Sequence, residues 1–381
     1  MTDAASPLFR PLAVRSLQLP NRIVMSPMTR SHSPNGVPGP DVAEYYRRRA
    51  AGGTGLIVTE GVAIDHPTAV DNPRVPHMYG DAALEGWRRV VDAVHAEGGR
   101  IVPQLWHVGP LWGAMNPKAD PTLVPMRPSG VWGQVGVTSY GEEYVTRASE
   151  PTRAMTEEDI EQVIAAYASA AAAAAEVGFD GIALHGGHGY LLDSFLWDRT
   201  NLRDDEWGGD LERRSRFPAT VVAVIRSAID PGLPILYRFS QHKQQDYTAR
   251  IAESPEELGA LLTPLARAGV DVFDASIRRF ETPAFEGSDL SLAGWAKKVT
   301  GTLSMAVGGV GIGTTLRENR ATGAAPTRNN VPELERRMDD GEFDLVAIGR
   351  LHLADPALAA TLRRGGPLPE FDRTVHETTL T

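Results

Sequence analysis

Eight short runs of apolar, largely β-branched residues recur along the whole chain, and this repetition is the feature that most limits its fold. The runs cover residues 23–26, 56–59, 101–104, 181–184, 235–239, 270–275, 304–307 and 345–348. Longer stretches with helical periodicity lie between them, at 81–97, 157–177, 211–228, 255–268 and 331–340. Apolar strands joined by crossover helices predict a parallel sheet that is covered on both faces.

The number of these units favours a closed barrel over an open sheet. Eight β/α units fit a (β/α)8 barrel, and the 381-residue chain shows no break in composition that would separate two halves. We therefore predict a single (β/α)8 domain over residues 1–381. Residues 8–22 predict a hairpin that closes the bottom of the barrel, and Thr156 followed by Asp159 predicts a capping box at the start of a helix.

Composition excludes several kinds of chemistry. The chain has no cysteine, so disulfides, thiolate metal sites, iron–sulfur clusters and a cysteine nucleophile are all ruled out. A formal net charge of -10 disfavours a nucleic-acid partner. Residues 1–12 lack the basic and apolar segments of a signal peptide, and no apolar run could span a bilayer. We expect a cytoplasmic monomer or homodimer without a membrane partner.

Chemically versatile residues gather where the predicted strands end. Active sites of (β/α)8 barrels lie at the carboxyl ends of the strands. The residues at or just after those ends are Thr29, Glu60, Gly61, Gln104, His185, His188, Arg238, Gly308, Gly309, Gly349 and Arg350. The sequence therefore predicts one site at this end of the barrel.

Glycine-containing turns follow the last two runs, as Gly308-Gly309 and Gly349-Arg350. Glycine lets backbone N–H groups approach an anion, and an arginine adds a charge-assisted contact, so the pair of turns indicates a phosphate site. Glycines that merely permit tight turns give the same spacing. Neither GxGxxG after a strand nor GxxxxGK[ST] occurs, so a dinucleotide-binding sheet and a P-loop are not indicated.

A histidine pair and a tyrosine follow the fourth run. His185, His188 and Tyr190 fall within HGGHGYLLDSFLW. Imidazoles can ligate a metal, transfer a proton or donate a hydrogen bond to an anionic atom, but no third ligand with zinc spacing accompanies them, so we predict no metal site. Purely structural histidines and a packed tyrosine are the alternatives to a proton-donating role for Tyr190. Arg238, at the end of the fifth run, needs an anionic partner, either a carboxylate or a bound cofactor.

The longest segment without periodicity covers residues 107–154. It is rich in tryptophan and also holds Tyr140 and Tyr144. Disordered loops are poor in aromatic residues, so we expect an ordered lid or pocket wall after the third strand.

Seven motifs, in order along the chain, resemble the Old Yellow Enzyme family of FMN-dependent ene reductases. They are NRIVMSPMTR at 21–30, EGVAI at 60–64, QLWHVG at 104–109, HGGHGYLLDSFL at 185–196, WGGDLERRSRF at 207–217, YRFS at 237–240 and AIGR at 347–350. The resemblance covers nearly the whole chain. It implies a TIM barrel with bound FMN that reduces activated C=C bonds of enones, maleimides or nitroalkenes, by a ping-pong reaction with NADPH or NADH.

The resemblance also implies roles for individual residues. Pro27, Met28, Thr29, Gly61, Gln104 and Arg238 would contact the flavin ring, while Gly308, Gly309, Gly349 and Arg350 would hold its phosphate. Of these, Thr29 would lie near O4 and Arg238 near N1 and O2. His185 and His188 would hydrogen-bond the substrate oxygen, and Tyr190 would protonate Cα after hydride reaches Cβ. Trp106 is counted with these three as a substrate-binding residue.

Two features depart from the common pattern of the family. His188 stands where many members carry asparagine, and an unusual segment rich in Gly, Thr, Asn and Arg separates the phosphate turns at 314–330. Two other functions remain open on the residues alone. One is a flavin-free barrel lyase or hydrolase that acts on a phosphorylated metabolite, and the other is a non-catalytic flavin-binding protein.

Overall fold

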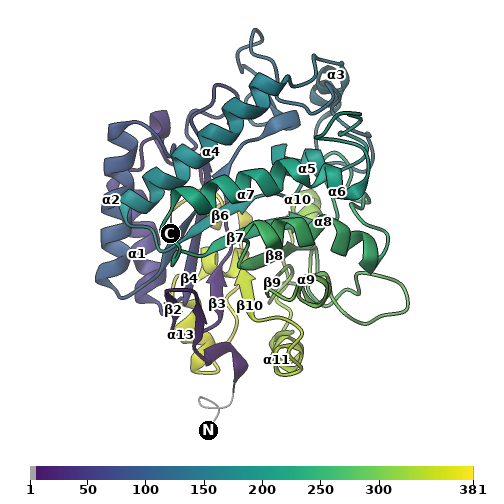
Figure 1. Ribbon diagram of the computed structural model, residues 1–381. Coiled ribbons are helices and arrows are strands. Elements are labelled where there is room, and N and C mark those ends of the chain that lie inside the picture. The colour runs from purple at the N-terminus through teal and green to yellow at the C-terminus, as the bar shows by residue number, and fades with distance from the viewer. Residues whose placement is uncertain (1–5, 381) are drawn as a thin grey trace.

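The chain folds into a closed barrel of eight parallel strands (Figure 1). The computed structural model describes residues 6–380, so part of the N-terminal stretch 1–12 and Thr381 lie outside the described residues. The strands are β3 (Ile23–Met25), β4 (Leu56–Ala63), β5 (Ile101–Trp106), β6 (Ile182–His185), β7 (Ile235–Ser240), β8 (Val272–Ser276), β9 (Leu303–Val307) and β10 (Leu345–Ile348). Pairing of β10 with β3 closes the barrel and confirms the predicted fold.

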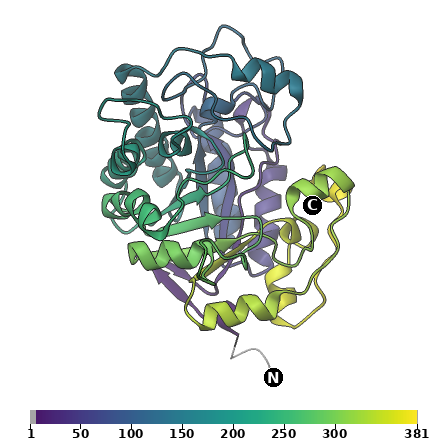
Figure 2. The same ribbon diagram turned by 90° about the vertical axis from the view of Figure 1, so that its right-hand side faces the viewer.

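Helices surround the barrel, as Figures 1 and 2 show. They are α1 (Pro40–Ala51), α2 (Asp81–Ala96), α3 (Glu142–Ser149), α4 (Glu157–Val177), α5 (Leu191–Leu196), α6 (Leu211–Arg214), α7 (Arg216–Ala228), α8 (Pro255–Ala268), α9 (Leu292–Thr300), α10 (Leu316–Thr322), α11 (Val331–Asp339), α12 (Arg350–Ala354), α13 (Leu358–Arg363) and α14 (Arg373–His376). The capping box of Thr156 and Asp159 is present at the start of α4. Within residues 6–380, no helix combines the length and apolarity needed to cross a membrane.

The predicted N-terminal hairpin consists of β1 (Leu12–Val14) and β2 (Leu17–Leu19), which pair antiparallel. Val14, Leu17 and Leu19 are buried in one cluster with inward-facing apolar side chains from all eight barrel strands. Burial of each such side chain contributes about 1.5–3 kcal/mol. The hairpin therefore closes the amino-terminal end of the barrel with close packing.

Strand β4 continues beyond the predicted boundary at residue 59. Glu60 and Gly61, which the sequence suggested as residues after the strand, lie within it, and the pairing with β5 shifts register between Val58 and Gly61. A buried acid and a glycine are unfavourable in most strands. Here the Glu60 N–H donates to the Tyr46 hydroxyl at 2.9 Å, which satisfies the backbone where the ladder is irregular.

Two other predicted segments differ in detail. The helical stretch 211–228 is divided between α6 and α7, because Pro218 cannot donate the N–H that would continue a single helix. The segment 314–330 contains α10, which begins at a capping box of Thr315 and Glu318. Local capping therefore gives part of this unusual segment a helical structure.

Candidate active site

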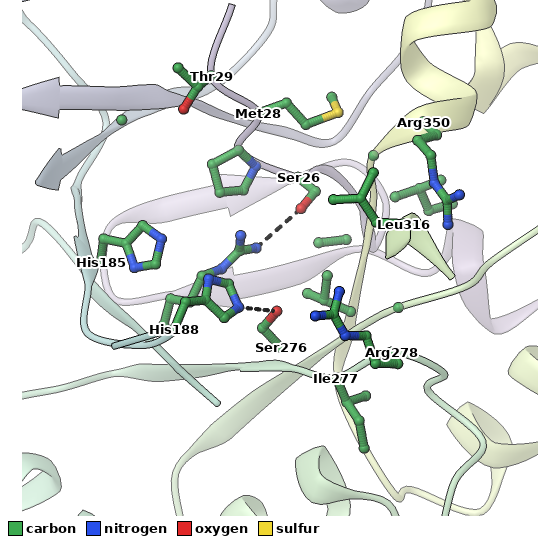
Figure 3. Close-up of a pocket in the computed structure, with 18 of the residues that line it drawn as sticks. Ser26, Met28, Thr29, His185, His188, Ser276, Ile277, Arg278, Leu316 and Arg350 are labelled. Atoms are coloured by element: carbon green, nitrogen blue, oxygen red, sulfur yellow. Dashed lines mark hydrogen bonds between the residues drawn. The ribbon is translucent and has the colours of Figure 1, made fainter. Parts of the chain in front are cut away.

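A cavity of about 410 Å³ opens at the carboxyl ends of the strands. The fourteen residues to which the sequence assigned a role in the site all line the cavity (Figure 3 shows several of them), whereas Glu60, also predicted near the strand ends, does not. The fourteen are Pro27, Met28, Thr29, Gly61, Gln104, Trp106, His185, His188, Tyr190, Arg238, Gly308, Gly309, Gly349 and Arg350. Residues in or just after seven of the eight strands thus meet in one place.

The two histidines and the tyrosine form a compact group at one side of the cavity. His185 is the last residue of β6, and its ring centroid lies 5.1 Å from that of His188 and 4.7 Å from that of Tyr190. His188 adopts a left-handed backbone with φ of 64°. That conformation is uncommon outside glycine. Its N–H donates to the Ser240 hydroxyl at 2.8 Å, and its Nε2 lies 2.9 Å from the hydroxyl of Ser276.

Both imidazoles are neutral in this environment. Burial lowers the pKa of His185 well below 6.5, and the nearby Arg238 charge lowers it further. Burial also lowers the pKa of His188 well below 6.5, and the neighbouring His242 and the charges of Arg238 and Arg278 lower it further. The Gly187 N–H points at Nδ1 of His185 at 3.5 Å, which favours the tautomer with its proton on Nε2. The pair is therefore suited to donate hydrogen bonds rather than to carry positive charge.

Tyr190 has the protonation state that a proton donor requires. It precedes α5, and its ring meets Trp106 edge-on with 5.0 Å between centroids. Burial raises the pKa of the phenol above its usual value of 10. The hydroxyl therefore keeps its proton at neutral pH.

Arg238 has a carboxylate partner and still lines the cavity. Its Nε donates to Asp274 at 2.6 Å and its Nη2 donates to the Ser26 hydroxyl at 3.1 Å. Burial raises the pKa of Asp274, and the Arg238 charge opposes that rise. Sequence reasoning missed Asp274, although an acid inside the apolar run 270–275, which also holds Asp271, is a signal that could have found it.

The cavity has the polar groups that FMN requires. Gln104 Nε2 and Arg350 Nη1 are buried, and neither has a partner among the described residues. Arg350 Nη2 donates to the Thr314 carbonyl at 2.9 Å, and burial lowers the pKa of this guanidinium to about 10, so it remains charged at neutral pH. A Cβ on Gly308 would lie 2.1 Å from the Ile277 carbonyl oxygen, so only glycine fits this turn. The Gln104 amide can therefore donate a hydrogen bond to an acceptor atom on a bound ring, and Arg350 can bind an anion.

The segment 107–154 packs against Tyr190 outside the cavity. Tyr140 and Tyr144 pack with the buried Trp132 and with Tyr190 in one cluster. No described residue from this segment is among those that line the cavity. The expected lid or wall is thus an ordered backing for Tyr190. Among residues 6–380, no group of three or more potential metal-binding residues occurs.

Several other cavity residues were not among the site residues predicted from the sequence, although four of them fall within the quoted motifs. They are Ser26, Arg30, His242, Gln244, Ser276, Ile277, Arg278, Val307, Val310, Ile312, Leu316, Arg320, Ala347, Ile348, Leu353 and Glu377. Glu377 comes from the C-terminal segment, which Arg30 holds through its Nη2 bonds to the carbonyls of His376 and Thr379 at 2.9 and 2.7 Å. No local pattern predicts these long-range contacts.

Comparison with known proteins gives a consistent answer. Residues 7–368 match the NADH:flavin oxidoreductase / NADH oxidase family. Flavin oxidoreductase hxnT of Emericella nidulans is 32% identical over 96% of this chain and 93% of its own length. The 12-oxophytodienoate reductase 1 of Oryza sativa subsp. japonica is 33% identical over 98% of this chain and 90% of its own.

Solved structures agree with these sequence matches. Morphinone reductase superimposes with a TM-score of 0.78 and 29% identity, over 100% of this chain and 97% of that one. The Old Yellow Enzyme homologue from Zymomonas mobilis gives 0.77 and 25% identity, over 98% and 97% of the two chains. The family match, the similar sequences and the superimposed structures together show that this chain belongs to the Old Yellow Enzyme family of FMN-dependent oxidoreductases.

Proposed function

We propose that this protein is an NAD(P)H-dependent ene reductase that reduces the activated C=C bond of enones, maleimides and nitroalkenes. The observation that carries the proposal is the group of two neutral imidazoles and one protonated phenol at one side of a single cavity. When bound, FMN supplies hydride transfer, first from NADPH or NADH and then to the alkene. The nicotinamide coenzyme and the alkene therefore bind in the same cavity one after the other, so the reaction follows ping-pong kinetics.

The histidine pair polarises the alkene in this proposal. His185 and His188 donate hydrogen bonds to the carbonyl or nitro oxygen of the substrate, where negative charge grows as hydride reaches Cβ. Donors that are already in place stabilise such charge more effectively than water does. The Ser240 bond to the His188 backbone and the contact with Ser276 hold the second imidazole for this purpose.

Tyr190 completes the reduction by supplying a proton. Addition of hydride at Cβ leaves a carbanion-like Cα, and the phenol hydrogen then forms the second new C–H bond. The product has gained one hydride and one proton, and the phenolate recovers its proton from solvent. Trp106 holds the phenol ring edge-on and lines the substrate end of the cavity.

The opposite side of the cavity binds the cofactor. We assign Pro27, Met28, Thr29, Gly61, Gln104, Gly308, Gly309, Gly349 and Arg350 to FMN. Arg238 supplies positive charge on the flavin side, and Asp274 orients its guanidinium through the 2.6 Å bond. A cation held in this way favours a cofactor that becomes more negative on reduction.

Anaerobic turnover with 2-cyclohexenone tests the proposal. We expect purified protein to release FMN on heating, and to consume one NADPH or NADH for each cyclohexanone formed. Protein that binds FMN without reducing any activated alkene would support the non-catalytic alternative. Absence of stoichiometric flavin would favour a flavin-free lyase or hydrolase instead.

A further inference from the structure

Two arginines of the cavity and a third arginine close to them have no acidic ion-pair partner among residues 6–380. Arg278 follows β8, while Arg317 and Arg320 are one turn apart on α10. Arg278 and Arg320 line the cavity, and Arg320 is also exposed to solvent. The guanidinium carbons of Arg278 and Arg317 lie 4.2 and 5.9 Å from the centroid of the Tyr247 ring. We call these three residues the arginine cluster.

Nearby carboxylates are engaged with other cations. Glu318 lies 4.0 Å from Arg279, and Glu281 bonds to Arg328 at 2.5 Å. Glu377 is the one carboxylate among the described cavity residues, and it pairs with Arg373 at 2.8 Å. Within residues 6–380, no carboxylate forms an ion pair with the arginine cluster. Although the formal net charge of the protein is -10, the described residues thus leave these three cations close together without a carboxylate partner.

Electrostatic repulsion among the three guanidinium groups indicates that the cluster binds an anionic ligand. Burial lowers the pKa of Arg278, and the charges of Arg320 and Arg317 lower it further. Its Nη2 atom is buried and has no partner among the described residues. Repulsion between unpaired cations is relieved when an anion binds between them.

The phosphate of FMN does not account for this cluster. Arg350 and the glycine turns already provide a site for it, and Arg278 and Arg350 point into the cavity from opposite sides (Figure 3). Arg317 and Arg320 are exposed, which places their charges outside the buried cofactor region. The Arg320 charge acts on Tyr190 and the Arg278 charge acts on Arg350, so the cluster lies between the substrate side and the phosphate side of the cavity.

We propose that Arg317 and Arg320, with Arg278 beneath them, bind the 2′-phosphate of NADPH and make this enzyme prefer NADPH to NADH. The inference rests on the proposed function, because it assigns the coenzyme of that same site. A phosphate monoester carries nearly two negative charges and is well matched by several guanidinium groups, and an arginine commonly accommodates the 2′-phosphate of NADP. The adenosine end is farthest from the nicotinamide, so it meets residues at the mouth. The Tyr247 ring offers a flat surface beside it.

Anaerobic stopped-flow measurement of flavin reduction tests the assignment. We expect the flavin of the wild-type holoenzyme to be reduced at least ~10-fold faster by dilute NADPH than by dilute NADH. A difference of about 10-fold is what one additional charge-assisted hydrogen bond contributes to binding. The double variant Arg317→Ala, Arg320→Ala should lose most of the NADPH rate and keep the NADH rate within about 2-fold. The matched control Arg267→Ala, Arg364→Ala removes two exposed arginines elsewhere and should change neither rate. Equal losses with both coenzymes, or no preference in the wild type, would overturn the proposal.

A binding measurement separates this inference from the proposed function. Calorimetric titration of the holoenzyme with 2′-AMP and 5′-AMP should show tighter binding of 2′-AMP, and the double variant should abolish the difference. Added salt should weaken 2′-AMP binding in the wild type, because both arginines are exposed. Equal affinity for the two nucleotides would contradict the 2′-phosphate site. Failure of both coenzymes to reduce the flavin, with selective 2′-AMP binding retained, would instead refute the proposed reductase function alone.

Discussion

The phenol of Tyr190 stands edge-on to the imidazole of His185, with 4.7 Å between the two ring centroids. Trp106 meets the same phenol at 5.0 Å, and both partner rings are buried. Edge-to-face packing of this kind adds about 0.5–1.5 kcal/mol beyond area burial for each pair. The proton donor and the hydrogen-bond donor are thus fixed relative to each other before substrate arrives.

Replacement of Tyr190 by Phe should separate the two half-reactions. The variant retains the aromatic ring, so flavin reduction by NADPH should be nearly unchanged. Reoxidation by cyclohexenone should slow by ~10²–10⁴-fold, the usual contribution of a general acid. A nitroalkene is the control substrate, because its nitronate is stable without a proton and should form at the normal rate. Equal slowing of both half-reactions in stopped-flow absorbance would exclude Tyr190 as the donor.

Phenol binding should report the charge of the histidine pair. Because the pKa values of His185 and His188 lie well below 6.5, neither ring should titrate between pH 6 and pH 8. Phenols should bind as phenolates and produce a long-wavelength charge-transfer band. Their affinity should rise with pH up to the pKa of the ligand itself and then level off. Affinity that falls across pH 6–7 would show that cationic imidazoles hold the ligand.

Loss of histidine donors should weaken both binding and catalysis. Removal of one oxyanion donor costs about 2.7–4 kcal/mol in the rate step of other enzymes. We expect His185→Ala to show a loss of that order with cyclohexenone. His188→Asn preserves a donor and should retain most activity, so it serves as the matched control. A double alanine variant that still binds phenols normally would contradict the assigned role.

Arg350→Ala should weaken FMN binding by about 10- to 150-fold, which corresponds to a charge-assisted contact of about 1.5–3 kcal/mol. Equilibrium fluorescence of free FMN measures the change directly. Arg267→Ala, on the far surface of α8, controls for the loss of one positive charge. Release of an adenine dinucleotide from wild-type protein, rather than the mononucleotide, would contradict the assignment of these turns.

Glu60 should give stability an unusual dependence on pH. Its Oε2 accepts the N–H groups of Arg30 and Ser31 at 2.8 and 2.9 Å, and burial raises its pKa from 4.5 to about 7. The folded state therefore holds this proton more tightly than the unfolded state, and stability falls as pH rises from about 4.5 to 7. We expect the wild type to lose about 3 kcal/mol relative to Glu60→Gln over that interval, measured by urea unfolding. The exposed change Glu85→Gln should show no such trend.

The Asp193–Lys243 pair should be costly to break. Both side chains are fully buried and 2.7 Å apart, and Asp193 also accepts the Gly189 N–H at 2.6 Å. Lys243→Met leaves an unpaired buried carboxylate and should destabilise the fold by about 3–5 kcal/mol in urea. The double change Asp193→Asn, Lys243→Met should restore much of that loss. Additive losses would show that the two groups do not interact.

Local patterns predicted the strands and much of the site because barrel topology places every strand end on one face. His185, Arg238 and Gly308 could be located from the runs that precede them. Contacts between distant segments could not be found in this way. An acid in an apolar run draws attention to Asp274, but its pairing with Arg238 becomes apparent only when β7 and β8 lie side by side.

The arginine cluster illustrates the same limit. Arg278 and Arg320 are separated by more than one β/α unit, and only the folded chain brings them to one cavity. The extension of β4 was also missed, because Glu60 resembles a loop residue until the hydroxyl of Tyr46 is known to lie beside it. Tertiary partners decided these cases against local preference.

The hairpin at the amino-terminal end also has a practical meaning for engineering. Val14, Leu17 and Leu19 close that end as part of one apolar cluster that includes side chains from every barrel strand. Substitutions there will alter thermal tolerance and leave substrate range unchanged, whereas substitutions in the loops on the opposite face will alter substrate range. Mutant libraries aimed at robustness and libraries aimed at selectivity can therefore be built on separate residues and afterwards combined in one chain.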